Sequence, residues 1–454
     1  MSDWTSERVA RVLGTPSAPQ QSFPSISTDT RSMEPGALFV ALVGERFDAH
    51  EFLGEAKARG ASGAVVRRGT PPVDGLVLFE VEDTLSALGA LARDRRHGIR
   101  GPVVAVTGTN GKTATKEMLA RAVETRWHTH ATRGNLNNLV GVPLTVLSAP
   151  SGTEALVAEA GASEPGEMAR LNAILEPTVG VITNVAVGHV EGFGSLEGVL
   201  REKLALLQNA PVAVVGTEPP ELARGARVPD RHVVVAGTSE YADVRPDAWR
   251  LDDGGKVQLA LRGVQVSLPL VGRHQVDNAM IALATALELE CDLAAVASAL
   301  RDVALPPGRC EVLRQGDLVV LHDAYNANPS SLTAALATAE VLRGDRPLVV
   351  VLGTMLELGD ESAALHAEVA DRVMAASPIL VAVTGAFVPA FRRHASALGD
   401  RLLTADDAAT LGELLAPRLG GNEFVLIKAS RGVRLERAIP YILPDSDVPC
   451  STIC

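Results

Sequence analysis

The sequence contains few cysteines, and their arrangement argues against a disulfide-stabilised protein. The 454 residues include only Cys291, Cys310, Cys450 and Cys454. These four show neither a disulfide framework nor a recurring metal-ligand pattern. Cys454 ends the chain, but Ser451 occupies the position at which a prenylated chain carries cysteine. This cysteine usage favours a reducing cytoplasm.

Aromatic residues and positive charge are also scarce. Aromatic residues make up 3% of the chain, and the formal net charge is −12. Both properties argue against a nucleic-acid partner, because such proteins need basic surfaces and stacking platforms. No apolar run reaches the roughly 20 residues needed to cross a bilayer. The N-terminus lacks a signal-peptide pattern. We therefore expect a cytoplasmic protein of two to four domains without stable membrane insertion.

The clearest motif is a glycine-rich loop between a predicted strand and a predicted helix. Residues 103–106 (VVAV) predict a buried strand, residues 108–113 (GTNGKT) a tight loop, and the helical spacing begins at Thr113. Backbone N–H groups at such a turn bind phosphate, Lys112 adds a positive charge, and the Thr113 hydroxyl can bind Mg²⁺. The general phosphate-loop pattern has glycine where Val106 stands. An ordinary strand–turn–helix corner is therefore the alternative.

Residues 1–98 precede this loop and predict a separate small α/β domain. Strands are expected at residues 37–42, 64–66 and 76–79, with a helix over about 51–59. Polar residues at 25–31 and 44–50 are candidate ligand contacts, because loops after strands commonly bind ligands in small α/β units. Surface turns are the alternative for both segments.

The predicted central domain covers residues 99–308. Glu159 follows a strand predicted at 155–158, and a second strand at 179–183 leads to His189. Side chains at the ends of parallel strands lie where ligands bind in such sheets. Lys203 follows on a helix that starts near residue 196. Each of these three residues could equally be structural if taken alone. A hairpin is expected over residues 256–270.

The remaining residues, 309–454, predict a C-terminal Rossmann-like α/β domain. Strands at 318–321, 348–352, 380–383 and 424–427 alternate with helical stretches. This alternation predicts a parallel sheet with helices on both faces. Loops at 323–329, 353–359 and 428–431 would face a shared cleft. The predicted fold class is thus α/β with three domains, the central one a phosphate-loop ATPase-like parallel sheet.

Several segments carry a resemblance to a known family. The GTNGKT loop resembles that of the Mur ligases and folylpolyglutamate synthetases. Other segments resemble the Mur ligases that join D-alanyl-D-alanine to UDP-N-acetylmuramoyl-tripeptide, among them 27–31 (STDTR) and 428–432 (KASRG). The most specific of them are 192–195 (GFGS), 325–329 (YNANP) and 355–359 (MLELG). The chain departs from the family pattern at Ala160, His322, Thr354 and Ala429.

The resemblance implies an ATP-dependent amide ligase acting in peptidoglycan precursor synthesis. ATP would phosphorylate the tripeptide carboxylate, and the amine of D-alanyl-D-alanine would then attack the acyl phosphate. Two Mg²⁺ ions are implied, with a carbamylated Lys203 as one metal ligand. Two anions must meet in this reaction, so cations are needed beside them. The resemblance also implies closure of the C-terminal domain over ATP, hinged near residues 305–309.

The resemblance assigns roles residue by residue. The implied catalytic residues are Lys112, Glu159, His189 and Lys203. The implied metal ligands are Thr113, Glu159, His189 and Lys203. ATP would contact Gly108, Thr109, Asn110, Gly111, Lys112, Thr113, His274, Asn278, Arg309, Asp323 and Asn326. The UDP-linked substrate would contact Ser27, Thr28, Asp29, Arg31, Arg46, Phe47, Asp48, His50, Asn135 and Asn138. Candidates for D-alanyl-D-alanine are Asn328, Ser430 and Arg431.

Two other functions are compatible with the phosphate loop. One is a different amide ligase of the same superfamily, which would add another amino acid or a glutamate tail. The segments at 325–329 and 355–359 argue against it. The other is a nucleotide-dependent switch, which would bind ATP without a UDP-sugar partner. The two further domains with polar loops argue against a switch.

We expect the protein to be a monomer.

Overall fold

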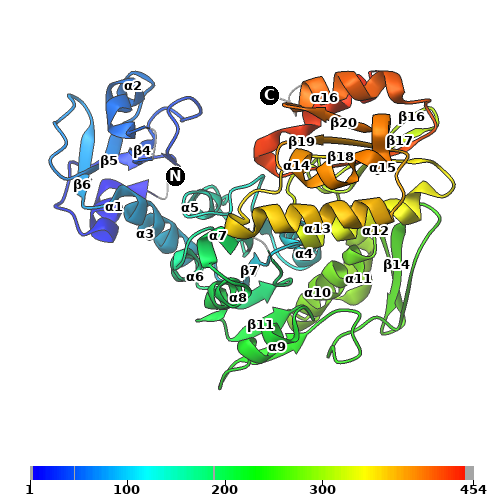
Figure 1. Ribbon diagram of the computed structural model, residues 1–454. Helices are drawn as coiled ribbons and strands as arrows, with labels where there is room; N and C mark the ends of the chain where they lie inside the picture. Colours follow the sequence, from blue (N-terminus) through cyan, green and yellow to red (C-terminus); the bar gives the residue numbers. More distant parts are fainter. Residues whose placement is uncertain (1–3, 45–46, 188–189, 445–454) are drawn as a thin grey trace.

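A computed structural model describes residues 4–44, 47–187 and 190–444 and has three α/β units (Figure 1). The N-terminal unit covers residues 4–96, the central unit 103–302 and the C-terminal unit 311–444. In Figure 1 the N-terminal unit and the C-terminal unit lie on opposite sides, and the central unit lies below and between them. The predicted α/β fold class is confirmed.

The N-terminal unit contains a small parallel sheet. Its four strands pair in chain order as β3 (Ile26–Ser27), β4 (Leu38–Val40), β5 (Gly63–Arg67) and β6 (Val77–Val81). The helix expected over 51–59 divides into a 3-10 turn, η1 (Ala49–Phe52), and α2 (Leu53–Ala58). Helix α3 (Thr84–Arg96) follows the sheet. Leu88 and Leu91 of α3 pack in the core of this unit, whereas Ala92 packs in a core of the central unit. The helix therefore joins the two units.

The central unit is built on a six-stranded parallel sheet. Its order is β12 (His232–Val235), β11 (Val212–Val215), β10 (Val179–Ile182), β7 (Val103–Thr107), β9 (Ala155–Glu159) and β8 (Thr129–Ala131). Helices α4 (Lys112–Glu124) and α10 (His274–Glu288) pack together on one face through Met118, Leu119 and Met280. Strands β7, β9 and β10 are adjacent, so the loops that follow them meet at one sheet edge.

An antiparallel sheet of three strands flanks the central unit. The predicted hairpin is present as β14 (Lys256–Leu261) and β15 (Val264–Val271). A third strand, β13 (Ala248–Leu251), pairs with β14 and was not expected. Its side chains are mostly exposed, so it lacks the apolar alternation that identified the other two.

The C-terminal unit contains a second six-stranded sheet. Its order is β16 (Glu311–Gln315), β17 (Leu318–His322), β21 (Phe424–Lys428), β18 (Leu348–Leu352), β19 (Leu380–Thr384) and β20 (Leu402–Ala405). All four predicted strands are present and parallel. The sequence missed both edge strands, of which β16 is antiparallel.

Helices cover both faces of this second sheet, as predicted. Val350 packs into the core under α12 (Pro329–Arg343) and α13 (Ser362–Ala375). Its neighbours Val349 and Val351 pack on the opposite face, under α16 (Ala408–Leu415). A strand buried on both faces has a continuous run of apolar residues in its sequence, and the central strands of this sheet have such runs.

The central and C-terminal units are in direct contact. The N-terminal end of α12 lies at the phosphate loop, and the Glu191 N–H donates to the Glu357 carbonyl at 3.4 Å.

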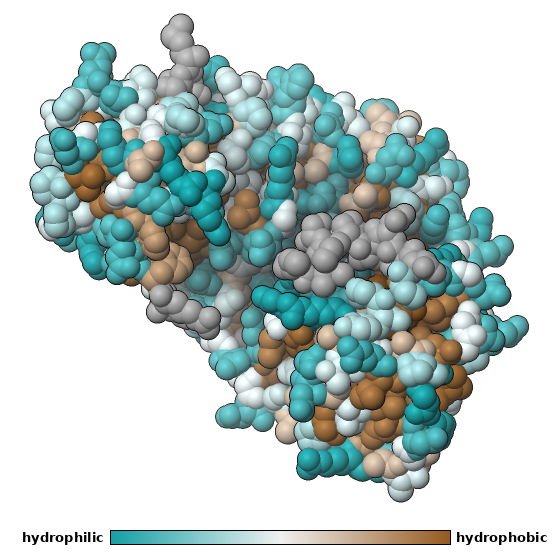
Figure 2. Space-filling model, turned by 90° about the horizontal axis from the view of Figure 1, so that it is seen from above, coloured by the Kyte–Doolittle hydropathy of each residue, from teal (hydrophilic) through white to brown (hydrophobic). Residues whose placement is uncertain are grey.

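The face seen from above has hydrophobic residues interspersed with hydrophilic ones, without a continuous hydrophobic band (Figure 2). Among the described residues, no helix combines the length and apolar character needed to span a bilayer.

Candidate functional site

The phosphate loop connects β7 to α4, and two of its glycines are required by close packing. Gly108 has φ 151°, and a Cβ there would lie 1.8 Å from Thr183 Oγ1. Gly111 has φ 80°, and its Cβ would lie 2.2 Å from Asn278 Oδ1. Helix α4 begins at the next residue, Lys112. The N–H groups of the first turn of α4 have no acceptor within the helix and suit an anion, whereas the N–H groups of Thr109 and Asn110 bond Asn184.

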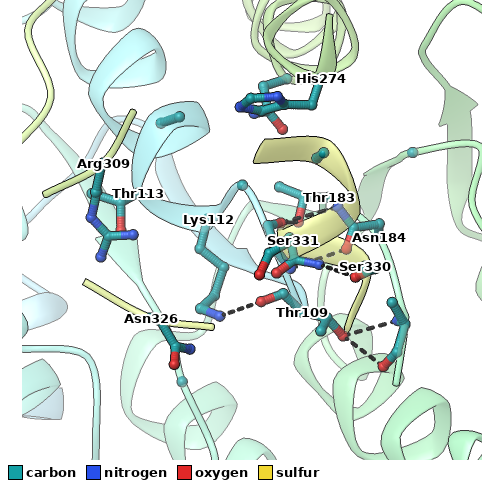
Figure 3. A pocket seen from close by; sticks show the side chains of 18 of the residues that line it. Thr109, Lys112, Thr113, Thr183, Asn184, His274, Arg309, Asn326, Ser330 and Ser331 are labelled. Atoms are coloured by element: carbon teal, nitrogen blue, oxygen red, sulfur yellow. Dashed lines mark hydrogen bonds between the residues drawn. The ribbon is translucent and has the colours of Figure 1, made fainter. Parts of the chain in front are cut away.

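Lys112 folds back over its own loop. Its Nζ donates to the Gly108 carbonyl at 2.8 Å. It also donates to the Thr109 carbonyl at 3.2 Å (Figure 3). Burial lowers the pKa of Lys112, and the nearby Glu159 carboxylate opposes that shift. A largely desolvated ammonium interacts strongly with an incoming phosphate.

Glu159 forms the core of the candidate metal site. The carboxylate is 2% exposed. Its Oε2 accepts from Thr113 Oγ1 at 2.9 Å, and its Oε1 accepts from Asn137 Nδ2 at 2.9 Å. Mg²⁺ is commonly held by one or two carboxylates together with phosphate and water oxygens. Thr113 and Glu159 fit that pattern, and His189 lies outside the described residues.

Asn137 was missed by the sequence analysis, which selected its neighbours. Asn138 Oδ1 accepts from the Val140 N–H at 3.1 Å and from the Gly141 N–H at 2.8 Å, just where α5 (Gly141–Leu147) begins. Asn135 contributes a carbonyl that accepts from the Asn137 N–H at 2.8 Å. The loop with three asparagines was a visible signal. Which asparagine reaches Glu159 depends on how the loop folds, and spacing does not reveal it.

We expect Asn137→Leu to weaken Mg²⁺ binding about tenfold or more, because partners that orient metal ligands typically contribute 10- to 100-fold. Glu159 Oε1 would lose its donor and become free to rotate. A magnesium titration of nucleotide binding would measure the change. The same titration on Asn209→Leu is the control, since Asn209 bonds Asn172 instead. Equal magnesium affinity in both variants would refute the orienting role.

Lys203 is a buried cation beside Lys112. It lies near the end of α8 (Leu196–Leu204), which Ser195 caps, and it is 3% exposed. Burial, reinforced by the charge of Lys112 and opposed by Glu202, lowers the pKa of Lys203 to about 7. Within the part of the chain that the structure describes, its ammonium has no hydrogen bond or ion pair. A buried group of this kind is costly as a cation, so the environment favours the neutral amine.

Groups of the C-terminal unit complete the cleft. The cleft has a volume of about 710 Å³ and is lined by residues of both units, including Lys112, Lys203, Arg309, Asp323 and Asn326. Asp323 Oδ2 accepts from Lys428 Nζ at 2.5 Å, and the same ammonium donates to the Asn326 carbonyl at 3.0 Å. The structure therefore brings the predicted ATP contacts from both units together.

Tyr325 is a second residue that the sequence analysis left without a role. The Arg309 guanidinium lies over its ring, 3.7 Å from the centroid, and Arg431 lies at 5.9 Å. Arg309 Nε is buried, and it has no hydrogen-bond partner among the described residues. Stacking on an aromatic ring fixes the plane of a guanidinium. Tyr325 therefore determines where Arg309 points.

We expect Tyr325→Leu to weaken nucleotide binding several-fold, and Tyr325→Phe to preserve it. An exposed cation–π contact contributes roughly 0.5–1 kcal/mol, and a desolvated one about 2 kcal/mol. Phenylalanine keeps the ring and leucine removes it. Calorimetric titration with ADP would compare the two variants. Equal losses in both would show that the ring face is not the important group.

His274 and Asn278 both lie at the start of α10. His274 borders the cleft, with Nε2 3.8 Å from Cys310 Sγ, and burial lowers the pKa of its imidazole. Asn278 Nδ2 donates to Gln275 Oε1 at 3.0 Å, while its Oδ1 faces Gly111. Both predicted contacts therefore lie beside the phosphate loop.

Apart from Asn135 and Asn138, which belong to the central unit, the candidate UDP contacts form two groups on the N-terminal unit. Asp29 accepts from Arg31 Nε and Nη2 at 2.9 and 2.7 Å, and these bonds lower the pKa of Asp29 to about 2. Ser27 Oγ accepts from the Asp29 N–H, and Thr28 lies between them. Among the residues that the structure describes, none of the N-terminal unit lines the cleft.

The second group follows β4. Asp48 Oδ1 accepts from His50 Nδ1 at 2.5 Å, while His50 Nε2 accepts from the Arg67 N–H at 2.8 Å. This pair of bonds sets the His50 tautomer with the proton on Nδ1. The Phe47 ring is 59% exposed. Arg46 lies outside the described residues.

The three D-alanyl-D-alanine candidates differ in accessibility. Asn328 is 6% exposed and caps α12. Ser430 is 3% exposed, and its Oγ accepts from the Leu356 N–H at 2.9 Å. Arg431 keeps 57% of its side chain exposed despite an ion pair with Glu436 at 3.0 Å. Asn328 and Ser430 therefore hold loops together, and Arg431 is the most accessible of the three.

Comparison with known proteins identifies similar chains over nearly the whole length. The family profile of the Mur ligase middle domain matches residues 106–286, and that of the Mur ligase glutamate ligase domain matches residues 308–431. The UDP-N-acetylmuramoyl-tripeptide–D-alanyl-D-alanine ligase of Bacillus subtilis (strain 168) is 32% identical, over 96% of this chain and 97% of that protein. The ligase of the same name from Escherichia coli (strain K12) is 35% identical, over 91% and 92%.

Solved structures are similar as well. MurF from Acinetobacter baumannii superposes with a TM-score of 0.87 at 30% identity, covering 97% of this chain and 99% of that chain. MurF ligase from Thermotoga maritima, solved in complex with ADP, gives a TM-score of 0.80 at 29% identity, covering 92% and 96%.

Proposed function

Since the chain belongs to the Mur ligase family, we propose that it joins D-alanyl-D-alanine to UDP-N-acetylmuramoyl-tripeptide with hydrolysis of ATP. The products are UDP-N-acetylmuramoyl-pentapeptide, ADP and phosphate, so the enzyme makes a peptidoglycan precursor. The observation that carries this proposal is the cleft in which Lys112 and Glu159 of the central unit face Arg309 and Asp323. A ligase requires such a site, because the nucleotide and two further substrates must meet.

The chemistry proceeds through an acyl phosphate. The tripeptide carboxylate attacks the γ-phosphorus of ATP, and ADP leaves. The amine of D-alanyl-D-alanine then attacks the acyl carbon, and phosphate leaves with the bond electrons and takes up the proton that the amine nitrogen loses. Lys112 and Arg309 supply positive charge beside the phosphates, which offsets the repulsion between the two anions. Thr113 and Glu159 would hold Mg²⁺, which would neutralise phosphate charge. His189 and Lys203 are the proposed ligands of a second Mg²⁺.

We further propose that Lys203 is carbamylated. The neutral amine adds CO₂, forming an N–C bond and releasing one proton, and the product is an anionic carbamate. The 3% exposure of Lys203 and the charge of Lys112 beside it favour the neutral amine that this addition needs. A carbamate also replaces a buried cation by an oxygen ligand suited to Mg²⁺.

The candidate contacts indicate which substrate each domain binds. The N-terminal domain, residues 1–98, would hold the UDP end of the substrate through the candidate contacts at 27–31 and 46–50. The central domain, 99–308, would bind ATP, and the C-terminal domain, 309–454, would present D-alanyl-D-alanine. We assign the enzyme to the cytoplasm, where UDP-linked precursors and ATP occur together, and expect a monomer.

The proposed function is tested by ADP release with each substrate omitted in turn. We expect release to require both UDP-N-acetylmuramoyl-tripeptide and D-alanyl-D-alanine. Stimulation by another amino acid in place of D-alanyl-D-alanine would identify a different amide ligase of the superfamily. ADP release without any UDP-linked substrate would favour a nucleotide-dependent switch.

A further inference from the structure

Asn110 lies in the centre of the phosphate loop, but its side chain bonds to the C-terminal unit. Its Nδ2 donates to Ser330 Oγ at 2.7 Å, and its Oδ1 accepts from Asn328 Nδ2 at 2.8 Å. These partners are 220 and 218 residues away in the sequence. Both polar groups of the Asn110 amide therefore bridge the two units that form the cleft.

The backbone of Asn110 is held independently of this bridge. Its N–H donates to Asn184 Oδ1 at 3.0 Å. Its carbonyl accepts from Thr183 Oγ1 at 2.5 Å and from Asn184 Nδ2 at 3.1 Å. All three bonds lie within the central unit. The loop conformation should therefore survive removal of the Asn110 side chain.

The other end of the bridge is a rigid helix terminus. Asn328 is the N-cap of α12, and its Oδ1 accepts from the Ser331 N–H at 2.8 Å. Ser331 Oγ accepts from the Asn328 N–H at 3.0 Å, which completes a capping box, and Pro329 follows as the first helical residue. The Asn328 oxygen is used for capping, and its NH₂ group is turned to Asn110. Figure 3 shows Ser330 and Ser331 beside Thr183 and Asn184 of the central unit.

The bridged helix end belongs to the segment that carries groups of the cleft. Residues 323–328 connect β17 to α12, and Asp323, Tyr325 and Asn326 of this segment line the cleft. Lys428 bonds both Asp323 and the Asn326 carbonyl, so the segment moves with the sheet of the C-terminal unit. The distance from Asn110 to α12 therefore sets how close these groups lie to Lys112.

We propose that Asn110 is a positioning residue whose side chain latches the C-terminal unit to the phosphate loop, so that the two halves of the cleft meet around the nucleotide. The latch rests on the proposed function, in which ATP lies between the two units. The resemblance alone assigns Asn110 to ATP contact, which is the competing role. The structure favours the latch, because both amide groups of Asn110 are bonded to Asn328 and Ser330.

Three measurements on the full chain test the latch. Asn110→Ala and Ser330→Ala are compared with the unaltered protein by small-angle scattering with saturating ADP and Mg²⁺, by calorimetric ADP affinity, and by turnover. We expect a more extended scattering profile and a kcat lowered about tenfold in Asn110→Ala, since two neutral hydrogen bonds are lost. ADP affinity should stay within about threefold, because the backbone cradle persists.

Ser331→Ala is the matched control on the same helix turn. It removes the capping box but keeps both contacts to Asn110, so its scattering profile should match that of the unaltered protein. A profile as extended as that of Ser330→Ala would trace the effect to the helix end and overturn the latch. A large loss of ADP affinity in Asn110→Ala with unchanged scattering would make Asn110 a phosphate ligand and overturn it too.

Unchanged scattering and turnover in Asn110→Ala would likewise refute the latch. The double variant Asn110→Ala/Ser330→Ala should lose no more than Asn110→Ala alone, because Asn110→Ala already removes the bond to Ser330. Additive losses would contradict a shared role. If the unaltered protein fails to ligate D-alanyl-D-alanine, the proposed function fails, and the scattering comparison still decides the latch.

Discussion

Lys112→Met is expected to abolish ligation while leaving the protein folded. The ammonium lies over the phosphate loop, bonded to the Gly108 and Thr109 carbonyls, where the phosphates would bind in the proposed complex. Removing it should cost about 3 kcal/mol or more of transition-state stabilisation, which is at least about a hundredfold in kcat. Phosphate release in the presence of all three substrates measures the loss.

The fold should tolerate this substitution, because methionine retains the aliphatic part of the side chain. Thermal unfolding is expected to change little relative to the unaltered protein. Lys57→Met provides the control, since Lys57 donates to the Gly75 carbonyl in the N-terminal unit. Near-normal turnover of Lys112→Met would refute the role of Lys112 at the phosphates.

Lys203→Ala is expected to be nearly inactive and to recover part of its activity with added acetate or propionate. The truncation leaves space for a short carboxylic acid, and its carboxylate can replace the carbamate as an oxygen ligand. A plain lysine at this position would act as a cation, and a carboxylic acid could not replace it. Turnover is measured across a series of acid concentrations, with sodium chloride at matched ionic strength.

Two comparisons make the rescue specific. Acetate should not restore Lys112→Ala, because that residue acts through its positive charge. Recovery of Lys203→Ala with small amines, and none with acids, would refute carbamylation. Restored turnover is the decisive readout.

Local sequence was enough to locate the phosphate loop and the strands β7, β9 and β10 beside it, whereas β8, β11 and β12 of the same sheet were not predicted. The order of apolar strand, glycine loop and helix identified β7, the loop and α4, because glycines at positive φ and a lysine at a helix start leave few other structures. Strands buried on both faces, such as β18, were found from their continuous apolar runs. The edge strands β16 and β20 were missed, because half-buried edges lack that pattern.

The segments at 325–329 and 355–359 also pointed to the family from sequence alone. What the residues in these segments do was decided by the fold. Ser430 was a candidate ligand contact, yet it is 3% exposed and bonds the Leu356 N–H. Tyr325 received no role, yet its ring lies against Arg309. Such pairs join loops that follow different strands, so only the order of the strands in the sheet brings them together.

The sequence by itself determined the nucleotide loop and the α/β class, because both follow from spacing within a few residues, and the family resemblance supplied the candidate residues of the cleft. Tertiary structure alone decided that Asn137, rather than Asn135 or Asn138, orients Glu159, and that the Asn110 side chain faces α12. The physical reason is that a side chain's direction is set by the backbone around it. Its partner is set by packing between segments that can lie more than 200 residues apart, as Asn110 and Asn328 do.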